Sequence, residues 1–541
     1  LKIVKSILIN TAQMKTFHSK TIKLFGPPGT GKTTTLLNRI EKYIERGIRP
    51  QEIAYFSFTK KAVTEGIERA KIKFDLTDED LCNFRTIHSF CRQQFSTTPV
   101  LDEDIDIKEF HTSMGNVSLE YDDTYDGHRV RKNWALRIYD KARNMLKDPI
   151  LIYRREKVKR IGIDKFKNIV RLYEEFKEQH RVDFTDMLQN FIDNGEAPTF
   201  KLMIIDEAQD LTPLQWQFVY KLGAKAKRIY LAGDDDQAIY AWNGADVQAF
   251  QDFPGKDVVL KYSHRLNKQI FSFCKLLQNK ITDKKEKEFE PANKLPGQIL
   301  AFKNFSEIPF NAFTGKWFLL SRVREGVRVL EEEARKAGIY FQNQKGKKSF
   351  DINQFRAIKL WEDLTSGGKI LKEDVEILYM FIEEVAYGFR KLDTKAWRDI
   401  DPNLLMTYDD LTLFGGLDPA KERGPWWEAL NRKFSDRQKK YFFRMQNQNV
   451  DLNTRANIII DTIHQVKGGE ADNVVLFAYA NFPTDFDGKK TRLKPNEARV
   501  WYTGATRSKQ NLFLLGTKHK YSFPLARVYN QYMEMGHALQ G

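Results

Sequence analysis

A glycine-rich stretch near the amino end decides the fold, and it reads Gly26-Pro27-Pro28-Gly29-Thr30-Gly31-Lys32-Thr33. It fits the pattern G-x-x-x-x-G-K-[ST] and follows a short apolar run at 22–25, which predicts a strand, a loop and then a helix. Because glycine has no Cβ, backbone N–H groups can turn inward around phosphate oxygens, and the helix beginning near Lys32 points its positive dipole end at them. Lys32 would reach the β- and γ-phosphates, and the Thr33 hydroxyl would hold Mg²⁺. The sequence therefore predicts a nucleoside triphosphate site.

An acidic pair supplies the second half of this predicted site. It follows the run 202–205, which is apolar on both faces as a buried parallel strand requires. Ligands of open α/β sheets bind at the carboxyl ends of strands, so Asp206 would hold Mg²⁺ and Glu207 would orient and deprotonate the attacking water. A further predicted strand at 229–232 leads to Gln237, whose amide can sense a γ-phosphate, and then to Tyr240 and Trp242.

The composition limits the class of protein. At 541 residues the chain is too long for one core, so two to four domains are expected. There are 88 Lys and Arg residues against 72 Asp and Glu, a net charge of +16, which favours a polyanion partner, although a merely basic protein fits equally well. Cys82, Cys91 and Cys274 lack metal-ligand spacing and indicate neither a disulfide framework nor zinc, which favours a reducing, cytoplasmic compartment. No stretch is apolar enough to span a membrane and no signal peptide is evident, so no membrane partner is expected.

Further short motifs continue along nearly the whole chain. In order they are Ser57-Phe58-Thr59-Lys60-Lys61-Ala62, Thr86-Ile87-His88-Ser89-Phe90, Asp183-Phe184-Thr185-Asp186-Met187-Leu188, Gly233-Asp234-Asp235-Asp236-Gln237, Tyr262-Ser263-His264-Arg265, Leu320-Ser321-Arg322, Thr462-Ile463-His464, Lys467-Gly468-Gly469-Glu470, and Glu497-Ala498-Arg499-Val500-Trp501-Tyr502 with Thr506-Arg507. Together they resemble the UvrD/Rep/PcrA-type DNA helicases of superfamily 1, subgroup A. One motif can arise by chance, but the full set in the family's order is specific.

The resemblance implies an α/β fold of two RecA-like P-loop NTPase lobes, each a parallel sheet with helices on both faces, together with two mostly helical inserted subdomains. ATP and Mg²⁺ would bind between the lobes. The implied boundaries are 1–98 and 182–262 for the first lobe, 263–349 and 455–541 for the second, and 99–181 and 350–454 for the insertions. The small insertions and compact size favour a phage-encoded or mobile-element member, working in an infected host cell.

The same resemblance assigns roles around the nucleotide. Arg265 and Arg507, from the second lobe, would act as arginine fingers on the developing charge. From spacing alone these two would be surface or ion-paired arginines. Gln237 would contact the γ-phosphate, and Glu470 would reach the ribose. The remaining glycine-loop residues, Gly26, Pro27, Pro28, Gly29, Thr30 and Gly31, would cradle the phosphates.

Recognition of the adenine departs from the family pattern. Family members carry an Arg directly after the glycine-loop Thr and a Tyr directly before the motif IV Arg, and these side chains sandwich the base. Here the two positions are Thr34 and His264, so an imidazole can stack but the guanidinium is absent. Gln13 is the candidate for the family's adenine-reading glutamine, although it lies closer to Gly26 than is usual. Selectivity for ATP over other nucleotides is therefore left open.

The resemblance also places single-stranded DNA across both lobes. Phe58, Tyr240 and Trp242 would stack on bases, at about 1–3 kcal/mol for each stacked base. The residues expected along the backbone are Thr59, His88, Arg322, Thr462 and His464. The alternatives are structural: Phe58 as a core residue, the two histidines as internal ones, and Tyr240 as support for the lobe interface.

Three further expectations concern local structure. Within the insertions, helices are expected at about 134–146 and 166–180. The run Lys284-Lys285-Glu286-Lys287 is interpreted as a solvated surface.

The predicted function is an ATP-dependent helicase that translocates on single-stranded DNA, 3′ to 5′ by resemblance, and acts at single-strand/duplex junctions. One alternative keeps the motor without efficient unwinding and remodels protein–DNA complexes. A second is a non-catalytic nucleic-acid-binding module, and a third is RNA as the strand, since readers of a 2′-OH cannot be located from sequence.

Overall fold

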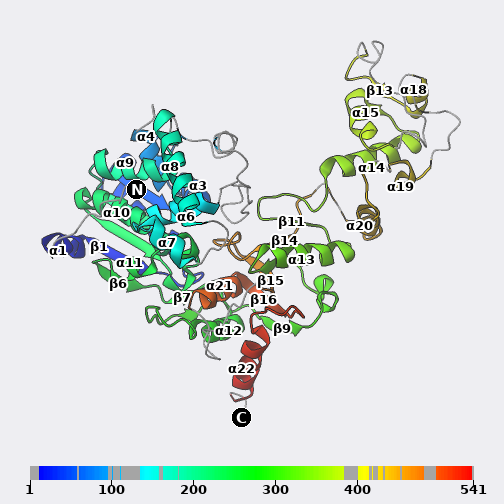
Figure 1. The fold of residues 1–541 in the computed structure, drawn as a ribbon. Coiled ribbons are helices and arrows are strands. Elements are labelled where there is room, and N and C mark those ends of the chain that lie inside the picture. Colours follow the sequence, from blue (N-terminus) through cyan, green and yellow to red (C-terminus); the bar gives the residue numbers. More distant parts are fainter. Residues whose placement is uncertain are drawn as a thin grey trace.

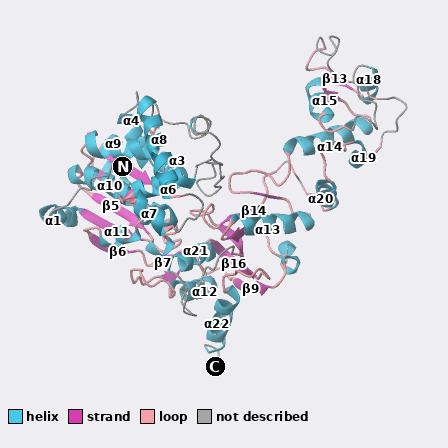
Figure 2. Cartoon of the chain, in the orientation of Figure 1, coloured by secondary structure: helices cyan, strands magenta, loops and turns pink. Residues whose placement is uncertain are grey.

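The computed structural model describes residues 11–57, 60–94, 100, 110, 134–156, 162–180, 182–382, 400–413, 417, 424–430, 433–450, 452, 454–480 and 495–538. Two six-stranded sheets dominate it, and every strand pair within them is parallel. Figures 1 and 2 show the two sheets side by side with helices around them. These are the two RecA-like lobes that the sequence predicts, and the α/β fold class is confirmed.

The first sheet has the order β3-β2-β4-β5-β1-β6. Its strands are β1 (Thr21–Phe25), β2 (Ile53–Ser57), β3 (Phe84–Thr86), β4 (Leu202–Asp206), β5 (Ile229–Gly233) and β6 (Lys256–Val259). The helices of this lobe are α1 (Thr11–Lys20), α2 (Lys32–Ile44), α3 (Lys60–Phe74), α4 (Ile87–Gln94), α9 (Phe184–Asn194), α10 (Pro213–Lys225) and α11 (Val247–Asp252). The predicted strands at 22–25, 202–205 and 229–232 and the helix from Lys32 are therefore confirmed.

The second sheet has the order β11-β14-β10-β15-β16-β9. Its strands are β9 (Gln298–Phe302), β10 (Trp317–Ser321), β11 (Phe341–Gln342), β14 (Ile458–Thr462), β15 (Ala471–Phe477) and β16 (Ser508–Leu515). Its helices are α12 (Lys268–Gln278), α13 (Arg324–Lys336), α21 (Pro495–Ala505) and α22 (Leu525–Ala538), and a two-stranded ribbon of β7 (Tyr262–Ser263) and β8 (Glu290–Pro291) lies between the lobes. In Figure 1 α22 extends away from this lobe to the carboxyl end.

Apolar strands explain why both sheets are covered on two faces. All five residues of β4 are buried, and they alternate between two cores: Leu202 and Ile204 join one, Met203 and Ile205 the other. The central strand β10 of the second sheet is buried throughout and alternates in the same way. Parallel strands whose two faces are apolar need helices on both sides, which is the layered arrangement observed.

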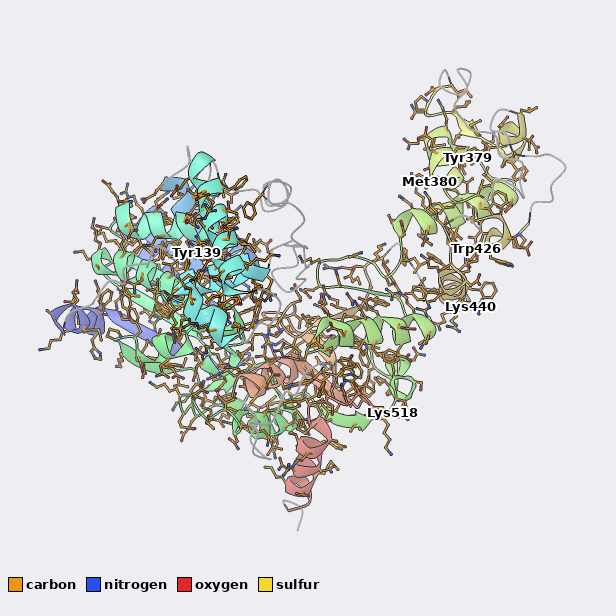
Figure 3. All side chains as sticks on the ribbon, viewed as in Figure 1. Tyr139, Tyr379, Met380, Trp426, Lys440 and Lys518 are labelled. Atoms are coloured by element: carbon orange, nitrogen blue, oxygen red, sulfur yellow. The ribbon has the colours of Figure 1, made fainter. Side chains whose placement is uncertain are left out.

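The insertions carry their own small cores. The first contains α6 (Trp134–Asn144), α7 (Pro149–Arg155) and α8 (Ile163–His180), which confirms both predicted helices. The second contains α14 (Ile352–Thr365), α15 (Lys372–Tyr379), α18 (Tyr408–Leu413), α19 (Trp426–Ala429) and α20 (Asp436–Asn447), with the antiparallel pair β12 (Ile370–Leu371) and β13 (Leu405–Met406). Figures 1 and 3 show this second group, including Tyr379 and Trp426, as a body apart from both sheets. The exact domain boundaries remain predictions.

Among the helices that the structure describes, none combines the length and the apolar character needed to cross a bilayer. Cys82, Cys91 and Cys274 are all free thiols, as their spacing predicts.

Candidate functional site

A cavity of about 280 Å³ lies where the two lobes meet, beside the glycine loop. The first lobe contributes Pro28, Gly29, Thr30, Gly31, Lys32, Thr33, Thr34, Ala62, Glu65, Arg69, Asp206, Glu207, Asp210, Gln237 and Tyr240 to its lining. The second contributes Arg265, Lys467, Gly468, Glu470 and Arg507. All six residues predicted to be catalytic line this cavity, so the structure brings together side chains that are up to 475 positions apart in the sequence, from Lys32 to Arg507.

The glycine loop is shaped around an open cradle. Gly29 and Gly31 have φ of 73° and 77°, which side-chain-bearing residues rarely adopt. A Cβ at Gly26 would lie 2.0 Å from Cγ of Lys32, so a side chain at position 26 would clash with the lysine in this conformation. Lys32 Nζ donates to the carbonyl oxygen of Gly26 at 2.7 Å. Gly31 is the N-cap of α2 and has no side chain to satisfy the first amides, which suits that helix end to phosphate oxygens.

The acidic pair lies at the carboxyl end of β4, as expected. Tyr55 on β2 donates its hydroxyl to Asp206 Oδ2 at 2.6 Å and holds this carboxylate in place. Burial, and then the adjacent Glu207 charge, raises the pKa of Asp206 to about 6. Glu207 has φ of 54°, a strained left-handed conformation for a residue with a side chain. Burial opposes its ionisation, but Lys32 and Lys467 outweigh burial and lower its pKa.

A chain of hydrogen bonds joins the acidic pair to Gln237. Gln209 donates to Glu207 Oε2 at 2.5 Å and accepts from the backbone N–H of Asp234 at 3.0 Å. Asp234 in turn accepts from Gln237 Nε2 at 2.7 Å. Arg507 of the second lobe donates to the Gln237 side-chain oxygen. Gln237 is therefore linked to Glu207 through this chain and bonded directly to an arginine of the other lobe.

The predicted motif IV segment touches the glycine loop directly. Ser263 Oγ donates to the carbonyl oxygen of Pro28 at 2.6 Å, and His264 N–H donates to that of Gly29 at 2.9 Å. A Cβ at Gly29 would lie 2.3 Å from Cβ of Arg265 and 2.9 Å from its backbone nitrogen. The absence of a side chain at Gly29 is thus what lets the second lobe close against the phosphate loop.

Both predicted arginine fingers face the cavity. Arg265 forms an ion pair with Glu470 at 2.8 Å, so the two residues assigned to a phosphate and to the ribose contact each other. Burial, followed by repulsion from Arg265, lowers the pKa of Arg507 to about 9. Burial disfavours the positive charge of this guanidinium, and a phosphate bound beside it would stabilise that charge.

Lys467 crosses the cleft and was missed by the sequence reasoning. Its ammonium pairs with Asp210, donates to the backbone oxygen of Gln237 at 2.8 Å and lies 3.8 Å from Glu207 Oε2. It also lies 5.0 Å from the centre of the Tyr240 ring. Burial raises the pKa of Asp210 to about 7 even beside this lysine. Lys467 precedes Glu470 in the same motif, but nothing in the pattern indicates that it reaches the first lobe.

The interpretation of 284–287 as a solvated surface is wrong for Lys287. This side chain is 0% exposed and its ammonium contacts Asp235, Asp236 at 2.9 Å and Asp234 at 3.1 Å. Three adjacent carboxylates of the first lobe need a cation, and the second lobe supplies it. Glu286 does face solvent, at 87% exposure.

Some predicted nucleotide contacts lie outside the cavity. Gln13 is exposed on α1 and is not among the lining residues, so the structure does not bring it to the glycine loop. The His264 side chain is exposed and likewise does not line the cavity, whereas Thr34 does. Arg69, one turn from Glu65 on α3, supplies a guanidinium to the lining instead, and no sequence signal marked it.

The predicted nucleic-acid contacts are partly brought together. Tyr240, Trp242 and His464 form an aromatic cluster from both lobes, with ring centres 6.1–6.5 Å apart. His464 is half-buried, and desolvation and then Arg322 lower its pKa to about 3. Arg322 makes a bidentate ion pair with Glu497.

The remaining predicted contacts are scattered or undescribed. The Thr462 hydroxyl accepts from the Gln465 backbone N–H at 3.3 Å, and His88 packs edge-on to Phe184. Phe58 and Thr59 lie outside the described residues, so the stacking role of Phe58 stays a prediction.

The fold and the cavity together define a two-lobed P-loop nucleotide-binding protein. The model of the UvrD/REP helicase N-terminal domain matches residues 9–258, and that of the UvrD-like helicase C-terminal domain matches residues 442–519. The chain belongs to the UvrD/REP helicase family.

Several relatives are similar at low identity. An ATP-dependent DNA helicase PcrA of Staphylococcus epidermidis is 24% identical over 376 residues, which cover 61% of this chain and 49% of that protein. A putative ATP-dependent DNA helicase YjcD of Bacillus subtilis is 25% identical over 405 residues, 64% of this chain and 50% of the relative. The ATP-dependent DNA helicase PcrA of Bacillus subtilis is 23% identical over 389 residues, which cover 64% of this chain and 51% of that protein. The chain thus spans about half the length of these relatives.

Proposed function

We propose that the protein is an ATP-dependent DNA helicase that moves along single-stranded DNA. The observation that carries the proposal is the cavity between the lobes: its lining combines residues 28–33 of the phosphate loop and the acidic pair with two arginines and a lysine from the opposite lobe. A site built from two bodies is sensitive to their relative position, which is what a nucleotide-driven motor requires.

The residues present fit ATP with Mg²⁺. Thr33 and Asp206 would hold the metal, because a hydroxyl and a carboxylate are ligands that Mg²⁺ prefers, and both residues line the cavity, where the Tyr55 hydroxyl fixes the Asp206 carboxylate. ATP with Mg²⁺ supplies the phosphoanhydride bond whose hydrolysis drives the motor. Lys32 would neutralise the β- and γ-phosphates from the cradle at Gly26.

The chain's own side chains supply the remaining chemistry. Glu207 is ionised at neutral pH, since its pKa is lowered, and can accept a proton from the attacking water. Arg265 and Arg507 would stabilise charge that develops on the transferred phosphoryl oxygens. Both come from the second lobe, so the barrier would fall only when the lobes are closed.

Gln237 and Tyr240 would couple phosphate state to the DNA track. Gln237 is bonded to Asp234 on its own lobe and to Arg507 on the other, and three residues later Tyr240 begins the aromatic cluster with Trp242 and His464. A shift of Gln237 toward a γ-phosphate would therefore move rings that can stack on bases of any sequence. Translocation 3′ to 5′ and action at single-strand/duplex junctions are supported by the motif resemblance to subgroup A.

Steady-state ATPase with and without an oligo-dT strand tests the proposal in the wild type and in Glu207→Gln. We expect the strand to stimulate turnover and the substitution to lower kcat by about 10²–10⁴-fold, because a general base is lost. Glu286→Gln, which changes an exposed glutamate, serves as the matched control and should turn over normally. Turnover that ignores the strand, or a Glu207→Gln enzyme as active as the control, would refute the motor. Unwinding of 3′-tailed against 5′-tailed duplexes then tests polarity and strand separation.

A further inference from the structure

A second concavity, of about 440 Å³, lies on the first lobe away from the nucleotide cavity. Its lining consists of Arg39, Lys42, Tyr43 and Arg46 from α2 and its end, Ile48, Lys201 before β4, Lys227 and Arg228 before β5, and Tyr230 within β5. Six of these nine residues are cations and none is acidic. We call the six cations the basic pocket.

The basic pocket faces the opposite edge of the sheet from the nucleotide. Lys201 and Arg228 directly precede parallel strands β4 and β5, so they lie at the amino ends of these strands, whereas Asp206 lies at the carboxyl end of β4. Helix α2 begins at Lys32 in the phosphate loop and reaches Lys42 ten residues later, about 15 Å along its axis. The pocket is therefore separate from the ATP site and from the aromatic cluster of the predicted DNA track.

The charges of the basic pocket lack carboxylate partners. Within the part of the chain that the structure describes, no ion pair joins any of the six cations to an acidic side chain. Arg228 is held by the backbone oxygen of Ser19 at 3.3 Å, and Arg39 lies 5.9 Å from the centre of the Tyr230 ring. These contacts orient the guanidinium groups without neutralising them. Like charges this close repel, and an anion in the pocket would relieve that repulsion.

A comparison with a second basic groove shows that this is unusual for the molecule. The groove between α13 and α20 also holds six cations, but Glu331 and Glu332 line it too. There Arg335 pairs with Glu331, and Arg437 and Lys336 both approach Glu332. Carboxylates thus pair with three of the six cations of that groove, whereas no carboxylate is among the described residues that line the basic pocket.

We propose that the basic pocket binds the phosphodiester backbone of a nucleic-acid segment outside the cleft between the lobes. The proposal rests on the proposed function, because a protein working on one strand holds the adjoining duplex or the displaced strand at high local concentration. Six cations spread over a wide concavity match a chain of phosphates, and counterion release makes such binding favourable without base recognition. Tyr43 and Tyr230 add polar and apolar surface at the floor of the pocket.

The first test is the salt dependence of binding to a blunt DNA duplex, measured by fluorescence anisotropy. Lys42→Glu/Arg46→Glu reverses two exposed cations of the pocket, and Lys518→Glu/Lys520→Glu makes the same charge change on exposed residues of the second lobe (Figure 3 labels Lys518). We expect the pocket variant to lower the slope of log affinity against log salt by about two, since about 0.9 is lost per phosphate contact. Equal slopes in the two variants would overturn the proposal.

The second test locates the contact by acetylation footprinting of the full chain. Bound duplex should protect Lys42, Lys201 and Lys227 several-fold more than Lys518. Protection by a blunt duplex alone would identify unopened DNA as the occupant, and equal protection by oligo-dT would identify a single strand, both in support. Protection only by a poly-glutamate peptide, or none, would refute nucleic acid as the ligand. DNA-stimulated ATPase measured on the same samples separates the two ideas: stimulation without protection overturns the pocket alone, whereas no stimulation overturns the motor.

Discussion

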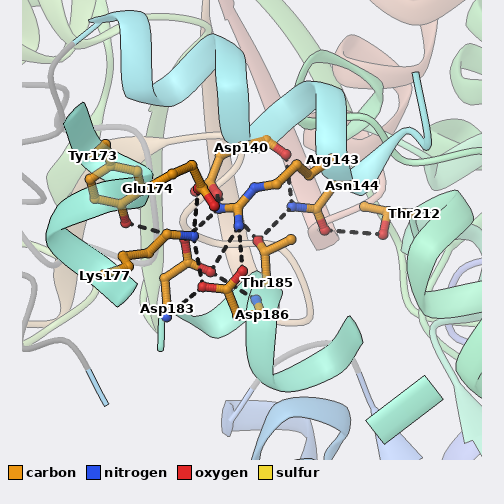
Figure 4. A network of polar contacts seen from close by, with 10 residues as sticks. All are labelled: Asp140, Arg143, Asn144, Tyr173, Glu174, Lys177, Asp183, Thr185, Asp186 and Thr212. Carbon is orange, nitrogen blue, oxygen red and sulfur yellow. Dashed lines mark hydrogen bonds and ion pairs between the residues drawn. The ribbon is translucent and has the colours of Figure 1, made fainter. Parts of the chain in front are cut away.

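Two buried charge clusters in this molecule meet the same electrostatic requirement but have different roles. The first, the insertion cluster, consists of Asp140, Arg143, Lys177, Asp183 and Asp186 (Figure 4). The second, the cleft cluster, consists of Asp234, Asp235, Asp236 and Lys287. Both place more carboxylates than cations in the interior, where an unpaired charge is costly.

The insertion cluster joins elements on one side of the cleft, namely the first helical insertion and the lobe that carries it. Arg143 on α6 pairs with Asp183 and, at 2.9 Å, with Asp186, while Lys177 on α8 contacts Asp186 at 2.7 Å. Asp183 and Asp186 also form the capping box that begins α9, so the helical insertion is fastened to the lobe at that helix end. Arg143 and Lys177 overcome burial and depress the pKa of Asp183.

The cleft cluster instead joins two bodies. Its carboxylates belong to the first lobe and its lysine to the second, and Asp234 also holds Gln237. In both clusters one carboxyl has a lowered pKa and another a raised one: burial raises the pKa of Asp236 to about 6 while Lys287 lowers that of Asp234, and burial likewise raises the pKa of Asp186. A buried ion pair on one side of the cleft therefore stabilises the fold, whereas one that crosses the cleft also sets the position of a reacting group.

The largest effect on stability should come from the insertion cluster. Arg143→Met would leave Lys177 as the remaining cation of the cluster beside three carboxylates and should cost about 3–5 kcal/mol of unfolding free energy. Urea unfolding measures this loss. Arg171→Met, which removes an exposed arginine that pairs with Glu175, should cost less than about 1 kcal/mol. Equal costs for the two variants would mean that the insertion cluster contributes no more than a surface pair.

The cleft cluster should respond in activity as well as in stability. Lys287→Met removes the cation beside Asp234 and should loosen Gln237, so kcat of the DNA-stimulated ATPase should fall about tenfold or more, about 1.4 kcal/mol. Lys287→Arg should keep a kcat between those of the wild type and Lys287→Met, because the positive charge is retained. Lys284→Met in the same segment is the control, since Lys284 pairs with the exposed Glu286. If the Lys287→Met protein folded and kept its kcat, the role of Lys287 would be purely structural, like that of the cations in the insertion cluster.

A smaller effect is expected at Lys467. Lys467→Met removes the contact with Asp210 and with the Gln237 backbone, and kcat should fall several-fold, up to about tenfold. The unfolding free energy should change little, because the raised pKa lets Asp210 take up a proton. Lys518→Met is the control for loss of a lysine from the second lobe. If Lys467→Met destabilised the fold and left kcat intact, the contact would be structural.

The smallest effect concerns pH and His464. Burial lowers its pKa from 6.5 to about 3, so between these values the unfolded chain binds a proton that the folded protein does not. Stability therefore rises with pH across that window and is lost as pH falls through it. His464→Gln should lower the slope of stability against pH by up to one proton between about pH 4 and 6. An unchanged slope in urea unfolding would show that His464 does not titrate differently in the two states.

Local patterns were enough to find several of the side chains that line the cavity. The phosphate loop and the pair Asp206 and Glu207 each depend on secondary structure within about a dozen residues. Consecutive positions are therefore enough to indicate their chemistry. The same holds for the parallel strands, whose unbroken apolar runs predict burial on both faces. Arg265 and Arg507 were found only through the motif resemblance, because an isolated arginine carries no sign of its partner.

The lysines show what only the tertiary structure decided. Lys287 lies in a charged run that looks solvated, Lys467 lies in a loop, and Lys42 lies on a helix surface, and the sequence describes all three alike. Their roles differ because their neighbours come from distant segments: three carboxylates of the other lobe for Lys287, an aspartate across the cleft for Lys467, and a pocket with five further cations for Lys42. By itself the sequence determined the fold, the family and the phosphate chemistry, since these rest on short-range patterns. Tertiary packing alone decided which charges are neutralised, because Coulomb energy and desolvation depend on distance in space and not on separation along the chain.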